Sequence, residues 1–188
     1  MSRQFTVRRG SPADLDELLS LRLEAEEWLR DNGEAHDSSP WATYSRGRII
    51  RRDMTVWETW LVFDGGRAAA TATLGGPDAD FWNEQDDPYS ALYLYKLIVS
   101  REYAGLGLGD AILDWACSRA QQDAKMWLRL DVWRDNTKLH EYYRCRGFEH
   151  VRTVSPEHRR SGALFQRPAG LVLAGSDVTL REVPAPGG

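Results

Sequence analysis

The stretch Leu97-Ile-Val99, followed after residues 100–103 by Ala104-Gly-Leu-Gly-Leu-Gly109, decides how the rest of the chain is interpreted. Glycines at alternate positions tolerate positive φ angles, so successive backbone amides can point into one concavity. The helix that we expect to begin at Gly107 adds a partial positive charge at its N-terminus, which favours a phosphate group. The stretch therefore predicts an anion site at the start of a helix.

The glycine pattern by itself also fits a dinucleotide-binding fold, or a tight turn with no ligand. Asp131 ends an expected strand about 20 residues after the turn, where dinucleotide-binding folds place a ribose-binding acid. That fingerprint, however, begins where the first strand of the fold ends, whereas residues 100–104 separate the strand from the glycines here. The dinucleotide-binding fold is therefore the weaker interpretation, and a turn without a ligand stays open at this point.

The elements around the turn follow from hydrophobic periodicity and turn residues. Residues 91–99 are apolar on both alternating faces, as in a central strand covered on two sides. Upstream we expect strands at 5–7, 56–63 and 67–74, a helix from Ser11 to Asp31 and a second helix within 41–52. Residues 75–89 are expected to form an irregular acidic loop. Downstream we expect a helix from Gly107, a helix after Asn136, and strands at 126–132, 148–154, 163–166 and 178–183.

A third motif, Asn136-Thr-Lys-Leu-His-Glu-Tyr-Tyr-Arg-Cys-Arg-Gly-Phe148, lies downstream of the turn. Taken together with Leu97-Ile-Val99 and the glycine turn, it resembles the GNAT (Gcn5-related N-acetyltransferase) superfamily over residues 5–166. The resemblance implies an α/β (α+β) fold, with a central mixed, mostly antiparallel sheet of six to seven strands flanked by about four helices. It implies one N-acetyltransferase domain, 1–169, and a C-terminal extension, 170–188, with a possible edge strand and a flexible tail.

The resemblance also implies acetyl-CoA as the co-substrate. Leu97, Ile98 and Val99 would offer backbone hydrogen bonds to the pantetheine arm, Asn136 would approach the cofactor, and Tyr143 would lie near its sulfur. The family's turn usually begins with Arg or Gln, so Ala104 leaves the backbone amides as the main anion contacts. The residues that would wrap the pyrophosphate are Ala104, Gly105, Leu106, Gly107, Leu108, Gly109 and Asp110.

Direct acetyl transfer to a primary amine in a ternary complex needs a base, oxyanion stabilisation and a proton donor for the leaving thiolate. Tyr143 suits the donor role, because a phenol with a pKa of about 10 is protonated at neutral pH. Core packing is its alternative role, and Tyr142 replaces it if the helix register slips by one. The candidate bases are Asp131, Glu26 or Glu27 on the first helix, and the loop acids from Asp80 to Asp87. An ordered water relay would also serve. Asn136 has a second interpretation as a helix N-cap.

The acceptor pocket is indicated less clearly, with Glu26, Trp41 and Trp82 as candidates. The acidic loop that contains Trp82 could attract a cationic amine, although a solvated charged face explains it as well. Four arginines within 46–52 could instead meet an anionic acceptor, or form an exposed helix face. We expect a small-molecule amine as acceptor. The alternatives are a protein or peptide amine, or a non-catalytic acyl-CoA-binding module.

Composition limits the partners and the compartment. The 188 residues are 42% apolar and 28% charged with a net charge of -4, which is typical of a globular protein without the basic surplus that nucleic-acid binding requires. No stretch is long and apolar enough to predict a membrane span or a signal peptide, so we expect a cytoplasmic protein, with a homodimer possible. Cys117, Cys145 and the four histidines lack metal-ligand spacing, so no metal site is predicted.

Overall fold

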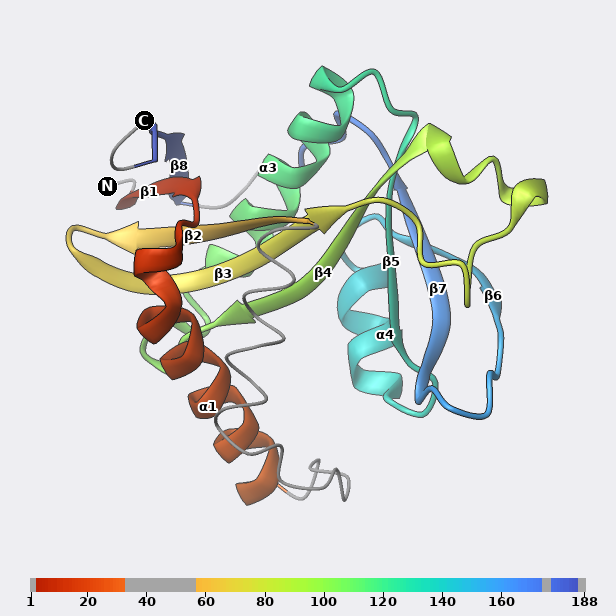
Figure 1. The fold of residues 1–188 in the computed structure, drawn as a ribbon, viewed down its shortest axis with the longest axis horizontal. Helices are drawn as coiled ribbons and strands as arrows, with labels where there is room; N and C mark the ends of the chain where they lie inside the picture. The colour runs from red at the N-terminus through yellow and green to blue at the C-terminus, as the bar shows by residue number, and fades with distance from the viewer. Residues whose placement is uncertain (1–2, 33–56, 174–176, 186–188) are drawn as a thin grey trace. The chain divides into compact units, whose positions relative to one another are not determined.

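The computed structural model describes residues 3–32, 57–173 and 177–185. Eight strands follow the order β6-β7-β5-β4-β3-β2-β1-β8 in a mixed, mostly antiparallel sheet, and the described residues include three α-helices (Figure 1). The expected α/β fold is confirmed with one or two strands more than predicted. The helix expected within 41–52, which includes Trp41, lies outside the described residues.

Contacts divide the chain into two compact units. Unit 1 comprises Met1–Thr73, Lys96–Ala111 and Ser176–Gly188, and unit 2 comprises Leu74–Tyr95 and Ile112–Gly175. Each unit is described by itself, and the single domain 1–169 stays a prediction. No helix in the described parts of the chain combines the length and apolarity that a bilayer span requires.

In unit 1, β1 (Arg3–Arg9) pairs antiparallel with β2 (Glu58–Asp64) and parallel with β8 (Val178–Glu182). β8 confirms the strand that was expected within the C-terminal extension. β2 continues through the turn at Gly65, which has φ +60°, into β3 (Arg67–Gly75). Leu18 of α1 (Leu15–Asp31) packs against Leu61 and Phe63, so the apolar stripe of the helix is covered by the hairpin (Figure 1).

The expected helix start at Ser11 is a 3-10 turn, Pro12–Asp14, which leads into α1. The Asp14 carboxylate accepts hydrogen bonds from the backbone amide and the hydroxyl of Ser11, at 2.7 and 2.9 Å. It also forms a bidentate ion pair with Arg8. These contacts, with Arg8 contributing most, lower the pKa of Asp14 to about 2.

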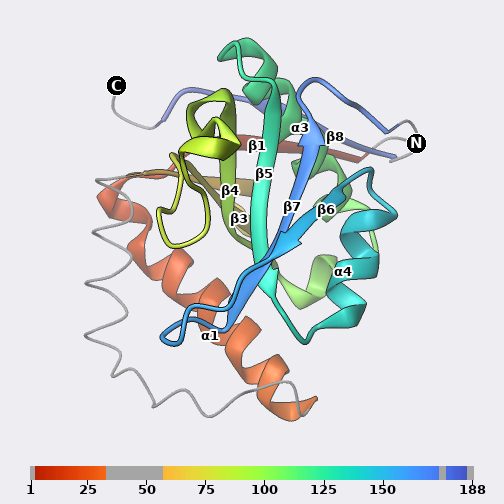
Figure 2. The same ribbon diagram turned by 90° about the vertical axis from the view of Figure 1, so that its right-hand side faces the viewer.

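In unit 2, β5 (Trp127–Trp133) pairs parallel with β4 (Ala91–Val99) and antiparallel with β7 (Ser161–Pro168), which pairs antiparallel with β6 (Glu149–Thr153). The short helix α4 (Thr137–Arg144) precedes β6 and lies beside it (Figure 2). The longer helix α3 (Leu108–Gln122) has residues in both units. The core of unit 2 gathers Phe81, Trp82, Ala91, Tyr93 and Leu164.

Two expectations about this part of the chain were wrong in detail. Strand β4 is not covered along its whole length: Tyr93 and Leu94 are buried, whereas Lys96 is exposed and Leu97–Val99 are only partly buried. The acidic stretch 75–89 is not wholly irregular, because it contains two 3-10 turns, Glu84–Asp86 and Pro88–Ser90. The first of these is capped by Asn83, whose side chain accepts from the amide of Gln85.

Candidate functional site

The glycine turn of unit 1 opens the helix α3, as expected. Gly105 and Gly107 have φ angles of +76° and +81°, which only glycine adopts at little cost. The amide of Ala111 bonds to the carbonyl of Gly107 at 3.0 Å, and this is the first bond of the helix. The amides of Leu108, Gly109 and Asp110 therefore have no acceptor within the helix, which is the state that favours an anion.

The turn is accessible to solvent, and the residue that precedes it is anchored in the core of unit 1. Ala104, Gly105 and Leu106 are exposed, and a Cβ atom built on Gly105 meets nothing within 4 Å. The preceding residue, Tyr103, is 3% exposed, and its ring packs edge-on against Phe5. The turn therefore combines a buried support with solvent-exposed residues at 104–106.

The strand before the turn is also tied down within unit 1. The amide of Ser100 donates to the carbonyl of Ala69 at 2.9 Å. The Glu24 carboxylate of α1 accepts from the hydroxyl of Ser100 and from the amide of Arg101, at 3.3 and 3.1 Å. Leu97, Ile98 and Val99 therefore lead into the turn along a fixed path, with their backbone at the partly open end of β4.

Tyr143 lies on α4 in unit 2 and is 8% exposed. Its ring packs against Tyr142, Phe148 and Phe165 at centroid distances of 5.2, 5.4 and 6.3 Å. Burial raises the pKa of the Tyr143 phenol well above its usual value, with further contributions from Tyr142 and from the negative charge of Asp131. The phenol is therefore protonated throughout the neutral range, as a proton donor must be. The same ring is also part of the packed core of unit 2.

Asp131 and Asn136 lie at the end of β5 and just beyond it, also in unit 2. Burial raises the pKa of Asp131, and a hydrogen bond with Ser161 opposes that shift. Its carboxylate is therefore a stronger base than an exposed one. The side chain of Asn136 accepts from the amide of Leu139 at 2.9 Å, so its role as the N-cap of α4 is confirmed, while a contact with the cofactor stays a prediction.

The sequence of this chain matches the profile of the acetyltransferase (GNAT) family over residues 18–148. It is also 34% identical over 143 residues to the uncharacterized N-acetyltransferase YesJ of Bacillus subtilis (strain 168), covering 72% of this chain and 77% of that protein. The chain belongs to the acetyltransferase (GNAT) family.

Solved structures of GNAT acetyltransferases share the fold. A GNAT family acetyltransferase from Listeria monocytogenes 4b F2365 is 22% identical and covers 87% of this chain and 94% of its own, with a TM-score of 0.68. The PaiA N-acetyltransferase from Thermoplasma acidophilum, solved in complex with coenzyme A, is 16% identical and covers 87% of this chain and 98% of its own, with a TM-score of 0.63. These structures share the fold, while the family profile and the Bacillus subtilis relative support the acyltransferase class of this GNAT chain.

The acceptor candidates of this GNAT chain fall in different places. Glu26 lies on α1 and accepts from Nε of Arg22 at 3.3 Å. Trp82 is 3% exposed and lies in the core of unit 2, with the guanidinium carbon of Arg129 4.7 Å from its ring centroid. A role for Trp82 as a pocket wall stays a prediction, but little of the ring is available to a ligand. Trp41 and the arginines within 46–52 lie outside the described residues.

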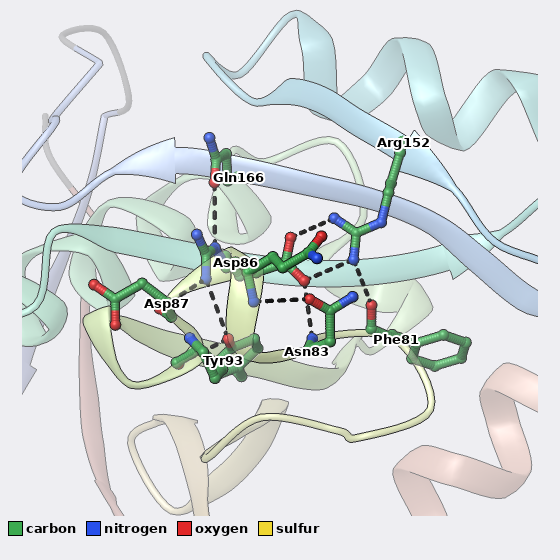
Figure 3. Close-up of polar contacts among 10 residues, drawn as sticks. Phe81, Asn83, Asp86, Asp87, Tyr93, Arg152 and Gln166 are labelled. Carbon is green, nitrogen blue, oxygen red and sulfur yellow. Dashed lines mark hydrogen bonds and ion pairs between the residues drawn. The ribbon is translucent and has the colours of Figure 1, made fainter.

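The acidic loop is held by arginines rather than left open to solvent. Arg152 forms a bidentate ion pair with Asp86 at 2.5 and 2.7 Å and donates to the carbonyl of Phe81 at 2.9 Å (Figure 3). Arg159 donates to both Asp78 and Asp80 at 2.9 and 2.8 Å. The hydrogen bond from Arg152 lowers the pKa of Asp86. Much of the negative charge of the loop is therefore neutralised within unit 2.

Two residues of unit 1 were missed in the sequence, Arg22 and Lys96. Lys96 is the only charged residue within 91–99, and the strand interpretation passed over it because its neighbours are apolar. Its φ angle of +51° lies in the left-handed region, which is rare for a side chain of this size and is often found at functional sites. A lone lysine inside an apolar run was the signal that could have identified it. Among the described residues, no group of three or more potential metal ligands is found.

Proposed function

We propose that the chain is an acetyl-CoA-dependent N-acetyltransferase that acetylates the primary amine of a small molecule by direct transfer in a ternary complex. The observation that carries the proposal is the glycine turn, which is solvent-exposed at residues 104–106 and opens α3 in a member of the GNAT family. The coenzyme A bound to the PaiA N-acetyltransferase supports the choice of cofactor. A dinucleotide has no comparable support.

The cofactor would be held mainly by backbone groups. The amides of residues 105–110 would bind the pyrophosphate, because those at the start of α3 have no acceptor within the helix. Leu97, Ile98 and Val99 would bind the pantetheine arm through their amides and carbonyls, and Asn136 would add a side-chain contact. Since Ala104 offers no hydrogen-bonding side chain, affinity should depend on the φ angles of Gly105 and Gly107.

Tyr143 would donate the proton that the coenzyme A thiolate takes up when it leaves. Its raised pKa keeps the phenol protonated at neutral pH, and its aromatic neighbours hold the ring in one orientation. Asp131 is our candidate for the base that takes the proton of the amine, because burial raises the pKa of its carboxyl. Both assignments are to be tested by substitution.

Direct transfer is supported by the state of the cysteines. An acyl-enzyme formed on cysteine would need a thiolate, but Cys117 is fully buried and burial raises the pKa of its thiol to about 11. Cys145 is exposed at the end of α4, where its thiol donates to Glu141. Full turnover in Cys145→Ser would support direct transfer, whereas acetylated Cys145 detected by mass spectrometry after incubation with acetyl-CoA alone would contradict it.

The test of the function is thiol release from acetyl-CoA with a panel of primary amines. We expect turnover that falls about 100-fold or more in Tyr143→Phe, since general acid catalysis contributes on that order. The affinity for acetyl-CoA should be unchanged in calorimetry. Tyr142→Phe on the neighbouring position is the matched control and should keep most of the turnover. Equal loss in both variants, or no loss in Tyr143→Phe, would contradict the role of Tyr143.

A non-catalytic acyl-CoA-binding module is the second candidate, because Ala104 removes a side-chain contact from the turn and β4 carries no carboxylate. Tight binding of acetyl-CoA without turnover on a broad amine panel would favour this candidate. Turnover on peptide amines alone would favour a protein acceptor over a small molecule.

A further inference from the structure

Unit 1 contains a hollow that the sequence did not reveal. It encloses about 330 Å³ of space, counting the solvent at its mouth. Its walls come from α1, β2, β3 and β4, all within the same unit. The residues that line it are Leu18, Arg22, Thr59, Thr71, Thr73, Lys96 and Ile98.

The threonines give the hollow hydrogen-bonding capacity in an otherwise buried wall. All three are at most 6% exposed. The Thr71 hydroxyl donates to the carbonyl of Trp60 at 2.9 Å. The hydroxyls of Thr59 and Thr73 lie 3.3 Å apart, so one of them donates to the other. The hydroxyl that accepts in this pair keeps its own proton for a ligand oxygen.

Two cationic side chains face the same hollow. Arg22 uses its Nε to donate to Glu26 at 3.3 Å, which is one of the five N–H donors of a guanidinium. Although Lys96 as a whole is exposed, desolvation of its ammonium beside the hollow lowers the pKa to about 8, and repulsion from Arg22 contributes to the shift. The charges of Arg22 and Lys96 therefore oppose each other, and an anion bound between them would relieve the repulsion.

The hollow also adjoins the strand end assigned to the cofactor. Ile98 lines it, and Leu97 and Val99 flank Ile98 in β4. The left-handed φ angle of Lys96 interrupts the extended backbone directly before these residues. Such interruptions redirect side chains and are frequent beside active sites.

We propose that this hollow binds the anionic group, a carboxylate or a phosphate, of a small amine acceptor, with Arg22 and Lys96 as the residues that select it. The role as an acceptor site rests on the proposed function, whereas anion binding does not. Whichever hydroxyl of Thr59 and Thr73 accepts within their pair donates its own proton to an anion oxygen. Glu26 is then a positioning residue that holds the guanidinium of Arg22, rather than a direct ligand of the amine.

The first test measures acceptor preference with matched amines of equal chain length that end in a carboxylate, a phosphate or a neutral carboxamide. We expect kcat/KM to favour an anionic amine over the carboxamide by about tenfold or more, since each charge-assisted hydrogen bond accounts for a factor of this order. A preference for the carboxylate or for the phosphate identifies the group, and equal kcat/KM for all three amines would overturn the proposal.

Substitutions test whether Arg22 and Lys96 are the residues that cause the preference for anionic amines. Arg22→Gln and Lys96→Met should each reduce the anion preference about tenfold, mainly through KM. Arg30→Gln, on an exposed turn of the same helix, and Lys125→Met, whose ammonium donates to the carbonyl of Tyr89, are the matched controls and should keep the preference. Loss in the controls, or an equal loss for anionic and neutral amines in Arg22→Gln and Lys96→Met, would overturn the proposal. Thermal melting checks that each variant folds.

A second test needs no turnover, so it separates failure of this proposal from failure of the proposed function. The chain has three lysines, Lys96, Lys125 and Lys138, so their ε-methylene NMR signals can be followed one by one. N-acetylglycine or inorganic phosphate should raise the pKa of Lys96 by about one unit, whereas neutral N-acetylglycinamide should not. Lys125 and Lys138 should keep their values. A Lys96 pKa that responds to neither anion, or equally to the amide, would overturn the proposal.

Discussion

The acidic loop of unit 2 and the cationic hollow of unit 1 show how differently charged residues can be used. In the loop, Asp78, Asp80 and Asp86 each have an arginine at hydrogen-bonding distance, and the opposite charges lower the pKa of Asp86. In the hollow, desolvation and, to a smaller extent, repulsion from Arg22 lower the pKa of Lys96, so like charges face each other. The charges of the loop are therefore paired within unit 2, whereas the hollow brings two cationic side chains to one wall.

The largest effect on stability is expected when the ion pair between Arg152 and Asp86 in the acidic loop is broken. Arg152→Met should lower the free energy of unfolding by about 2–3 kcal/mol, because it leaves Asp86 and the carbonyl of Phe81 without their charged donor. Urea denaturation measures the change. Arg160→Met at an exposed position nearby in sequence is the control, with an expected change below ~0.5 kcal/mol. Equal changes in the two variants would show that the loop is a solvated face.

A second prediction extends the same pairing rule to unit 1. Asp14 has a pKa of about 2, below its ordinary value of 3.8, so its ionised form stabilises the fold. That stability is present above about pH 4 and is lost as the pH falls through 2. The shift corresponds to about 2 kcal/mol in the free energy of unfolding at neutral pH. Urea denaturation of Asp14→Asn should show a loss of this order at pH 7, and a much smaller difference from the parent at pH 2.

The hollow should contribute far less to stability. Arg22→Gln removes an i,i+4 pair with Glu26 at the helix surface, which is worth about 0.5 kcal/mol or less. Urea denaturation should therefore detect almost no change, while the acceptor preference changes. A loss as large as that of Arg152→Met would mean that Arg22 is a structural residue, and the contrast between the two regions would disappear.

The smallest effect is expected at the exposed end of the loop. Asp80 accepts from His158 and Arg159, and these contacts lower the pKa of its carboxyl, with His158 contributing most. We expect Asp80→Asn to change the KM for a cationic amine less than about twofold, since surface charges paired in this way have weak effects. A much larger rise in KM would show that the loop attracts the acceptor after all.

The sequence predicted the fold well because its signals were local. The apolar run of β4, the glycine turn and the Asn136 cap all lie where expected, and the strand ends differ from the expected ones by at most two residues. The open end of β4 could not be predicted, because alternation says nothing about which residues leave the core. The negative charge of the loop could be predicted from the sequence. Its pairing with arginines could not, because those arginines lie far along the chain, in β6 and beyond it.

The candidate site was predicted only in part for the same reason. The turn and the helix start follow from glycine spacing, whereas the hollow collects residues from positions 18 to 98 that no local pattern links. Lys96 and Arg22 become a pair only after the chain has folded. Tyr143 was found through the family motif, whereas the helix pattern alone favoured core packing, and its ring is indeed buried.

The most direct measurement of the central claim is mass spectrometry of small amines after incubation with the protein and acetyl-CoA, with thiol release followed in the same reaction. We predict that an N-acetylated amine and free coenzyme A appear in equal amounts, and faster for anionic amines than for their carboxamides. Failure of the protein to bind acetyl-CoA, or thiol release without any acetylated amine, would contradict the account.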